Sequence, residues 1–338
     1  MLLKDLCECS GASGGEDEVR RIIAEELAKM GCPYEIDKLG SVIAHHPGES
    51  GNKKLLFAAH MDEPALMVHE ITEAGFLRFK AVGGNVIPRQ LAGRTVRIGK
   101  NVTGVVGFAP YHMMKIDQEH KEASARHQHI DIGSPNRERT LERVATGDYA
   151  VVDSSFLELG DNLKGKAMDS RTGCYGLLEL LRHAPKIAFD AAFTTMHEVG
   201  QRGMEVAAYT QRPELVVSVS TIPAADVPGS ADGAGRVELG QGVCIAVMDA
   251  GYAYGRSTAE KAKQLAEGAG IPYHLIPYAP AAAAAGFAAL CGTGAEALSL
   301  LVPCRNPKSP AGVIRKSDLH AMERMLELIV KNNGRSLL

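Results

Sequence analysis

The segment KKLLFAAHMD, residues 53–62, decides the fold class of this chain. Its apolar run is short and continuous instead of alternating, which is typical of a strand buried on both faces of a sheet. The segment KLGSVIAHH, residues 38–46, indicates a second short strand just before it. Because such strands occur in sheets that helices cover on both sides, we predict an α/β domain.

Helical patterns flank these strands. Residues 13–31 predict the first helix, with Ser13 as its N-cap, acidic residues in its first turn and Gly31 at its end. Helix and strand patterns alternate again from residues 167–185 onward and finish in a helix at residues 317–331.

The sequence pattern of residues 68–159, between these two regions, is different. Short alternating segments such as FLRFKAV, RTVRIG and VTGVVGFA are punctuated by glycine and proline, which is typical of a small β-barrel or sandwich. We therefore predict an α/β domain built from residues 1–67 and 160–338. An all-β domain at residues 68–159 interrupts it.

Composition narrows the class of protein. A chain of 338 residues favours two domains, and 37 basic against 40 acidic residues argue against nucleic acid or an anionic membrane as the partner. We find no apolar stretch of the ~20 residues that a membrane span needs, and the charged N-terminus does not look like a signal peptide. Seven scattered cysteines favour reduced thiols, so we expect a cytoplasmic protein.

Polar side chains stand at the ends of the predicted strands, where open α/β sheets place their sites. His60 and Asp62 end the strand described first, and Glu198 follows another; Asp169 is expected just before a helix that begins near Gly173. These are residue types that bind zinc, with Asp62 orienting His60. Alternatively, a histidine at a strand end is simply hydrogen-bonded, and an aspartate before a helix is its N-cap.

Seven segments occur in the order and spacing of one family. They are SGASGGEDEVRRIIAEELAKMG, AAHMDEPALMVHEI, IDIGSP, GKAMDSRTGC, TTMHEVGQRG, VELGQGVCIAVMDA and VPCRNPKSP. The chain resembles the tetrahedral aminopeptidases, also called deblocking or glutamyl aminopeptidases, some of which are labelled cellulases or endoglucanases. The resemblance implies a three-layer αβα peptidase domain with a mixed sheet, interrupted by a β-barrel used for dimerisation. It also implies a peptide substrate or ligand and a homo-oligomer, either a dimer or a dodecamer.

The same resemblance implies an active site with two divalent ions, zinc or cobalt. His60 corresponds to a ligand of the first ion, Asp169 bridges both ions, and Glu198 corresponds to a ligand of the second ion. Together these residues would remove N-terminal residues from peptides by metal-assisted hydrolysis.

Three further site positions depart from the family pattern. His197 stands where the family has its general base, a glutamate. Ser220, counted back from Asp226, stands at a lost aspartate ligand of the first metal, and Lys308 replaces a histidine ligand of the second. Gly294, taken to lie near Lys308, replaces an acid in the family's Gly-Thr-Asp-Ala.

Charge limits how many ions this set can hold. The family's five ligands carry three negative charges, whereas two carboxylates and one ammonium remain here. A buried lysine stays charged only beside carboxylates, so Lys308 is expected to reach the place of the second metal, near Asp169 and Glu198. We therefore expect at most one divalent ion per chain.

Three functional interpretations remain open. The first is a binding or assembly homologue in which aminopeptidase activity is weak or lost. The second is a hydrolase with one metal or none, in which Lys308 takes part and His197 is a base that titrates near neutral pH. The third is an ordinary two-metal aminopeptidase in which Asp226 or Asp232 supplies the missing ligand.

Overall fold

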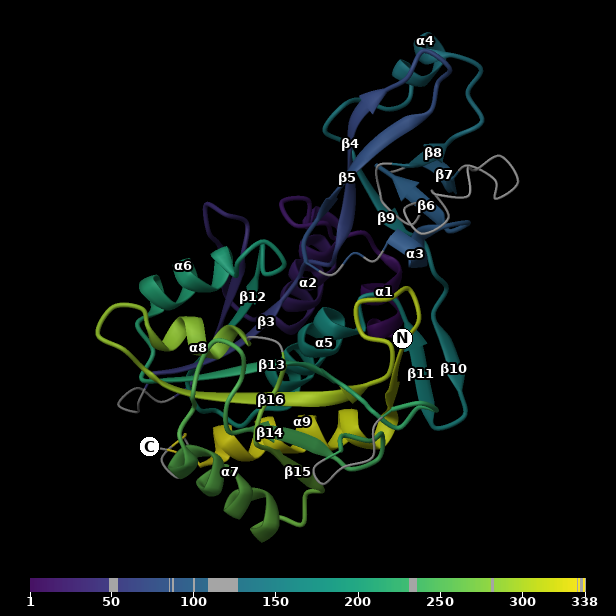
Figure 1. The fold of residues 1–338 in the computed structure, drawn as a ribbon. Helices are drawn as coiled ribbons and strands as arrows, with labels where there is room; N and C mark the ends of the chain where they lie inside the picture. The colour runs from purple at the N-terminus through teal and green to yellow at the C-terminus, as the bar shows by residue number, and fades with distance from the viewer. Residues whose placement is uncertain are drawn as a thin grey trace.

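A computed structural model describes residues 1–48, 54–84, 86, 88–99, 101–108, 127–230, 236–280, 283–332, 334 and 337 of the chain. An α/β domain forms its larger part, and a β-barrel projects from it (Figure 1).

The centre of the α/β domain is an eight-stranded mixed sheet. In spatial order its strands are β1 (Tyr34–Ile36), β2 (Val42–His46), β12 (Phe189–Thr194), β3 (Leu55–His60), β13 (Leu215–Pro223), β16 (Glu296–Cys304), β14 (Val243–Ala246) and β15 (Tyr273–Ile276). The four strands β12, β3, β13 and β16 are adjacent and parallel. Their carboxyl ends therefore meet at one edge of the sheet.

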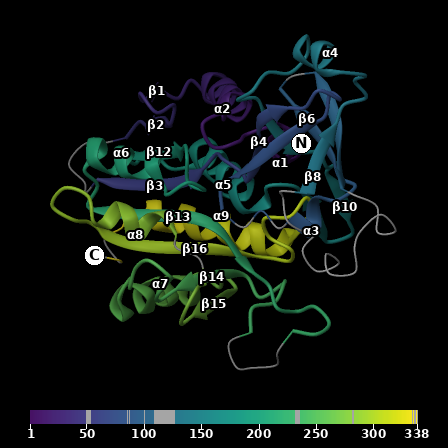
Figure 2. The same cartoon turned by 45° about the horizontal axis from the view of Figure 1, so that its top comes forward.

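Helices cover both faces of this sheet, so the predicted three-layer arrangement is confirmed (Figure 2). On one side lie α1 (Leu2–Glu8), α2 (Asp17–Met30), α5 (Met168–His183), α7 (Arg256–Gly268) and α9 (Lys316–Lys331); on the other lie α6 (Arg202–Gln211) and α8 (Ala284–Ala289). Strand β3 shows why: Phe57 and Ala59 belong to one hydrophobic core, whereas Leu56 and Ala58 belong to the other. Every residue of this strand is buried.

Two helix starts differ from the predictions. The helix predicted at residues 13–31 is α2, the second helix of the chain, and it begins at Asp17 after Glu16, so Ser13 is not its N-cap. The Ser13 hydroxyl instead donates to Asp62 at 2.6 Å. Gly31 ends this helix in the left-handed conformation, as predicted. Helix α5 begins at Met168, so Asp169 lies in its first turn and not before the helix.

The barrel is closed, and its strand order is β4-β5-β8-β7-β6-β9. The strands are β4 (Ala65–Ile71), β5 (Leu77–Val82), β6 (Thr95–Ile98), β7 (Val102–Phe108), β8 (Gln128–Asp131) and β9 (Tyr149–Val152), with two short helices, α3 (Pro88–Leu91) and α4 (Arg137–Leu141). Alternate residues such as Val68, Phe79 and Val106 fill its interior.

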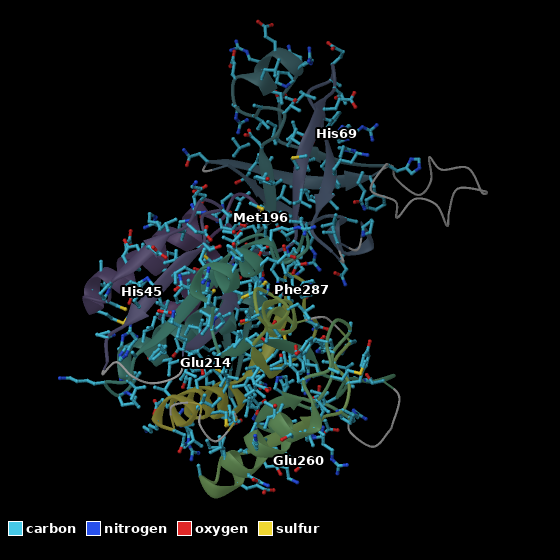
Figure 3. All side chains as sticks on the ribbon, turned by 90° about the vertical axis from the view of Figure 1, so that its left-hand side faces the viewer. His45, His69, Met196, Glu214, Glu260 and Phe287 are labelled. Carbon is cyan, nitrogen blue, oxygen red and sulfur yellow. The ribbon has the colours of Figure 1, made fainter. Side chains whose placement is uncertain are left out.

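A small sheet joins the barrel region to the α/β domain. It consists of β10 (Leu157–Leu159), β11 (Asn162–Gly165) and β17 (Gly312–Arg315). Side chains fill the region where the barrel meets the α/β domain, and Met196 lies close to this region (Figure 3). The seven cysteines are free thiols. In the part of the chain that the structure describes, no helix is long and apolar enough to cross a membrane.

Candidate active site

The carboxyl ends of the four parallel strands bring the predicted site residues together. His60 is the last residue of β3, His197 and Glu198 follow β12, and Lys308 follows β16. Asp169 comes from the first turn of α5, the helix that packs over β3 and β13. Polar residues far apart in the sequence thus share one sheet edge, where α/β folds place their ligands.

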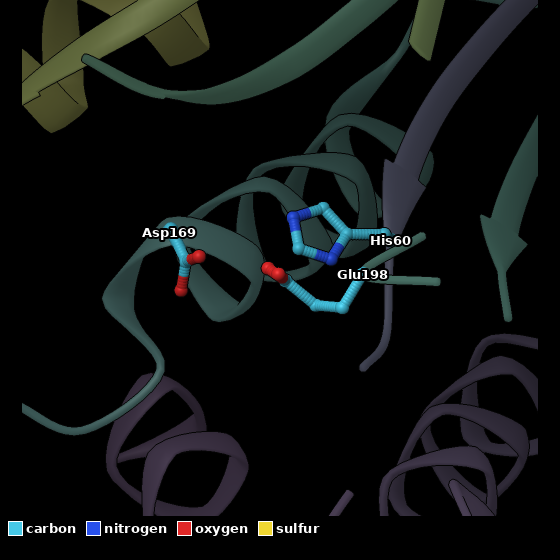
Figure 4. Close-up of side chains that lie close together, drawn as sticks. All are labelled: His60, Asp169 and Glu198. Atoms are coloured by element: carbon cyan, nitrogen blue, oxygen red, sulfur yellow. The ribbon is translucent and has the colours of Figure 1, made fainter. Parts of the chain in front are cut away.

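Three of these residues form a candidate metal group. Figure 4 shows the side chains of His60, Asp169 and Glu198 pointing toward one small space. One ligand atom from each lies within 4.8 Å of the other two. His60 and Asp169 are almost fully buried. This arrangement fits the residue types and the spacing that a divalent cation requires.

Asp62 holds two parts of the site in place. Its carboxylate lies 3.4 Å from Nδ1 of His60 and accepts the backbone N–H groups of His197 and Glu198, each at 2.9 Å. Burial acts to raise the pKa of Asp62, but hydrogen bonds from His60 and Ser13 and the nearby imidazole outweigh it and hold the pKa below its usual range. The ionised Asp62 therefore orients both His60 and the turn after β12.

Lys308 is bound to Glu198. Its Nζ atom donates to both carboxylate oxygens, each at 2.8 Å, and the Glu198 side chain is only 1% exposed. Burial acts to lower the pKa of Lys308, but the charges of Glu198 and Asp169 outweigh it and raise the pKa. Lys308 therefore carries its positive charge directly on one of the three candidate metal ligands.

The carboxylate of Asp169, unlike that of Glu198, forms no ion pair or hydrogen bond with another described residue. Both of its carboxylate oxygens are buried, and neither has a hydrogen-bond partner among the described residues. The Ser220 hydroxyl approaches it, but donates to the main-chain carbonyl of Asp169 at 3.2 Å. A buried carboxylate without a partner is costly, so its persistence indicates a ligand or an ion.

His197 lies flat against His60. The two rings stack with centroids 3.9 Å apart and planes 16° apart. Burial and the positive charges of His60 and Lys308 hold the pKa of His197 well below 6.5. These surroundings disfavour the protonated imidazole, in contrast to the expectation that His197 titrates near neutral pH.

The remaining sequence candidates lie elsewhere. Asp226 accepts two hydrogen bonds from Arg305, at 2.6 and 2.8 Å, and is not part of the candidate metal group; Asp232 lies outside the described residues. Gly294 precedes β16, whereas Lys308 follows this nine-residue strand. The two lie about 30 Å apart along it, so the prediction that Gly294 belongs to the same site is wrong.

Sequence patterns did not reveal the pocket beside these residues. It has a volume of about 310 Å³ and is bounded by His60, Asp169, His197, Ser220 and Lys308. Its apolar wall comes from Ile222, Pro223, Ala279, Ala283, Leu301 and Pro307, and Gln90 reaches it from α3 of the barrel region. Single apolar residues from separate strands and loops carry no local sequence signal, and only the fold brings them together.

Backbone strain marks the same region. Ala167, Met196 and Lys308 are non-glycine residues with φ values of 52°, 54° and 58°. Ala167 is two residues before Asp169, Met196 is two residues before Glu198, and Lys308 is itself a site residue. Such conformations are uncommon and cluster at functional sites, because the surrounding structure must enforce them.

The donor set fits one divalent ion and not two. His60 and Asp169 have donor atoms that face the shared space, and neither oxygen of Asp169 is hydrogen-bonded to another described residue. Glu198, however, has both oxygens bound to an ammonium group. A second dication there would have to displace Lys308 and leave its charge buried beside the metal.

Comparisons with known proteins show the family of this chain. The sequence matches the family model of the M42 glutamyl aminopeptidases over residues 40–325. The lysyl aminopeptidase of Pyrococcus furiosus is 30% identical over 294 residues, covering 82% of this chain and 80% of the relative.

Solved structures extend the likeness over almost the whole chain. The aminopeptidase APDkam598 of the archaeon Desulfurococcus kamchatkensis is 30% identical, with a TM-score of 0.91, and the match covers 97% of this chain and 93% of that one. The TET1 peptidase of Pyrococcus horikoshii, which can assemble into a tetrahedron or a large octahedral shell, is 29% identical, with a TM-score of 0.87 and coverage of 97% and 98%. The chain belongs to the M42 family of aminopeptidases, as the sequence motifs indicated.

Proposed function

We propose that this chain is an M42 homologue that has lost the two-metal aminopeptidase reaction and keeps a pocket for the N-terminal part of a peptide. One observation carries the proposal: the Lys308 ammonium group binds both oxygens of Glu198. The position of the second ion is thereby taken by a cation that is part of the chain. Peptide binding is supported by family membership and by the pocket at the sheet edge.

The replacements at positions 220 and 197 also disfavour the two-metal reaction. Ser220 brings a neutral hydroxyl where an aspartate ligand would bring a charge, so a first ion would have His60 and Asp169 as its remaining protein ligands. His197 is an imidazole whose ring packs on His60, and not a carboxylate base. Each change weakens either metal binding or proton transfer.

A one-metal hydrolase is the second candidate, and the unpartnered carboxylate of Asp169 favours it. His60 and Asp169 would hold the ion, which would supply Lewis-acid activation of water and of the peptide carbonyl. His197 would accept the proton as a neutral imidazole, and Asp62 would keep the His60 ring oriented. This candidate predicts slow hydrolysis that depends on both His60 and Asp169.

We further propose a homo-oligomer in which the barrel forms the dimer contact, with the α/β domain at residues 1–67 and 160–338 and the barrel domain at 68–159. Assembly is supported by the likeness to the TET1 peptidase, which forms closed shells. The free cysteines support a reducing compartment, the cytoplasm.

Reversing the three replacements tests the proposal. A His197→Glu, Ser220→Asp, Lys308→His variant recreates the family's ligand and base types in one step. With added cobalt it should hydrolyse leucine, lysine or glutamate p-nitroanilide at least ~100-fold faster than the native chain, because the base and the second metal return. Lys316→His is the matched control for Lys308→His, because Lys316 is half-exposed on α9. Native activity with cobalt equal to that of the restored variant would refute the proposal.

A further inference from the structure

A second pocket lies at the opposite end of the sheet from the candidate active site. It has a volume of about 360 Å³ and lies where α6 and α8, which pack side by side, end (Figure 1). Its described lining comes from two segments, residues 208–213 and residues 288–295, which lead into β13 and β16. We call this cavity the α6–α8 pocket. It shares no described lining residue with the pocket at the candidate active site.

The charge of the α6–α8 pocket is positive. Arg212 is the charged residue among its described lining residues, and no carboxylate is among them. Within the described part of the chain, no side-chain hydrogen bond or ion pair occupies the guanidinium group of Arg212. The backbone N–H groups of Gly292 and Thr293 likewise have no hydrogen-bond partner among the described residues. Because a guanidinium group binds carboxylate or phosphate oxygens in pairs, this lining favours an anion.

The backbone of Arg212 is strained. Arg212 is the C-cap of α6, with φ 49° and ψ 59°, which is the left-handed conformation. This conformation is uncommon for residues other than glycine, and Pro213 disfavours it further because a proline restricts the residue before it to extended conformations. A glycine would end the helix here without strain. Strained residues cluster at functional sites, so the conformation supports a binding role for Arg212.

The rest of the lining limits what accompanies the anion. Ala208, Pro213 and Ala288 provide small apolar surfaces, and Tyr209, which is 63% exposed, contributes an aromatic ring. A volume of about 360 Å³ is suited to a small molecule with one ring or a short carbon chain. A cationic group in the pocket would be repelled by Arg212.

We infer that the α6–α8 pocket binds a small organic anion, either a carboxylate or a phosphate ester, through the guanidinium group of Arg212. The carbon skeleton of the anion packs against Tyr209 and Pro213. The inference is independent of the proposed function, because the two pockets lie at opposite ends of β13 and β16 and share no described lining residue.

Cys291 allows binding at this pocket to be measured locally. Its half-buried thiol lines the α6–α8 pocket, whereas the half-buried Cys32 lies elsewhere, before β1. Burial raises the pKa of both thiols, so the full chain is alkylated with N-ethylmaleimide at mildly alkaline pH and analysed by peptide mass spectrometry. The probes are phenyl phosphate and phenylacetate, and the neutral phenylacetamide is their control. An anion at about ten times its dissociation constant should slow alkylation of Cys291 about tenfold and leave Cys32 unaffected.

Two substitutions of Arg212 separate binding from folding. Arg212→Gln should abolish the protection of Cys291, whereas Arg202→Gln, at an exposed arginine of the same helix outside the pocket lining, should preserve it. Arg212→Gly should also abolish the protection, yet its melting temperature should be at least that of the native chain, because glycine adopts the left-handed conformation without strain. Loss of binding in this variant therefore cannot be attributed to misfolding.

Calorimetric titration of the native chain with the same compounds provides an independent measurement. Protection and binding by one of the two anions alone would assign the pocket to that class, phosphate esters or carboxylates. Three results would overturn the inference: equal protection by phenylacetamide, protection that survives Arg212→Gly, or no binding of either anion at millimolar concentration by both methods.

Discussion

Two buried clusters of charged side chains meet at the start of α5 and differ in one respect. In the structural cluster, Glu63 accepts hydrogen bonds from Lys166 at 2.6 Å and from Arg171 at 2.9 Å. Arg171 is 0% exposed and also donates to main-chain carbonyls, including that of Leu6 at 2.8 Å. In the site cluster, Glu198 and Lys308 are paired, but Asp169, two residues before Arg171, has no partner in the described part of the chain.

The contrast between the two clusters distinguishes buried charges that stabilise the fold from a buried charge that can bind a ligand. A buried charge network in which each member is satisfied orders the chain, whereas a buried group left unsatisfied destabilises the fold unless a ligand completes it. Arg171 ties α5 to α1 and to Met61, the residue that follows β3. Asp169 makes no comparable contact within the described part of the chain, so its carboxylate is available to bind a ligand or an ion.

The largest effect is expected in the structural cluster. Arg171→Met leaves the buried Glu63 with one partner and removes the contacts to α1, so the free energy of unfolding should fall by about 3 kcal/mol or more. Urea denaturation measures this loss. Arg182→Met on the same helix is the control, because its ion pairs are partly exposed and should contribute about 1 kcal/mol or less. Equal losses of unfolding free energy in Arg171→Met and Arg182→Met would contradict the structural role assigned to the buried cluster.

Lys308→Met should have the next largest effect. The change leaves the buried carboxylate of Glu198 without its cation, so we expect a loss of about 2 kcal/mol in the free energy of unfolding. Thermal and urea denaturation should agree on the size of this loss. Lys316→Met, at a half-exposed ion pair, should change stability by about 0.5 kcal/mol or less. If Lys308→Met were as mild as Lys316→Met, the Lys308–Glu198 pair would not be a substitute for a metal ion.

Asp169→Asn should act in the opposite direction. The amide keeps the shape of the side chain and removes a buried charge that lacks a partner among the described residues. The free energy of unfolding should therefore rise by about 1 kcal/mol in the absence of ligand and metal. Asp161→Asn, at an 82% exposed side chain, should be neutral. A destabilised Asp169→Asn variant would show that the carboxylate has a structural role after all.

The smallest effect belongs to a pair outside both clusters. Hydrogen bonds from Arg305 hold the pKa of Asp226 below its usual range, so the pair stabilises the fold above about pH 4. Asp226→Asn should lower the free energy of unfolding by about 0.5 kcal/mol at neutral pH, because the pair is partly exposed. This deficit should shrink as the pH falls from about 4 toward the lower pKa of the folded state. Denaturation at several pH values measures it, and a deficit independent of pH would contradict the assigned cause.

Much of this site could be predicted from the sequence, because parallel strands align their ends. His60 and Glu198 follow apolar runs that are recognisable as buried strands, and the departures at Ser220 and Lys308 are visible once the surrounding motifs are matched. The partner of Lys308 also follows from charge alone, since a buried ammonium requires a carboxylate.

What could not be predicted depends on three-dimensional packing. The lowered pKa of His197 comes from its burial beside His60 and Lys308, which the pattern HEVG does not encode. Ser13 has the residue type of an N-cap, yet its hydroxyl is committed to Asp62 from a distant strand end. Gly294 is fourteen residues from Lys308 in the sequence and at the far end of β16 in space, because an extended strand separates them.

A metal count on the native chain tests the central claim most directly. Protein purified without chelator, dialysed against excess zinc or cobalt and then freed of unbound metal would be analysed by mass spectrometry for ions per chain. The account predicts fewer than two ions, since Lys308 takes the place of the second. Two tightly bound ions per chain would contradict it and identify the protein as an ordinary two-metal aminopeptidase.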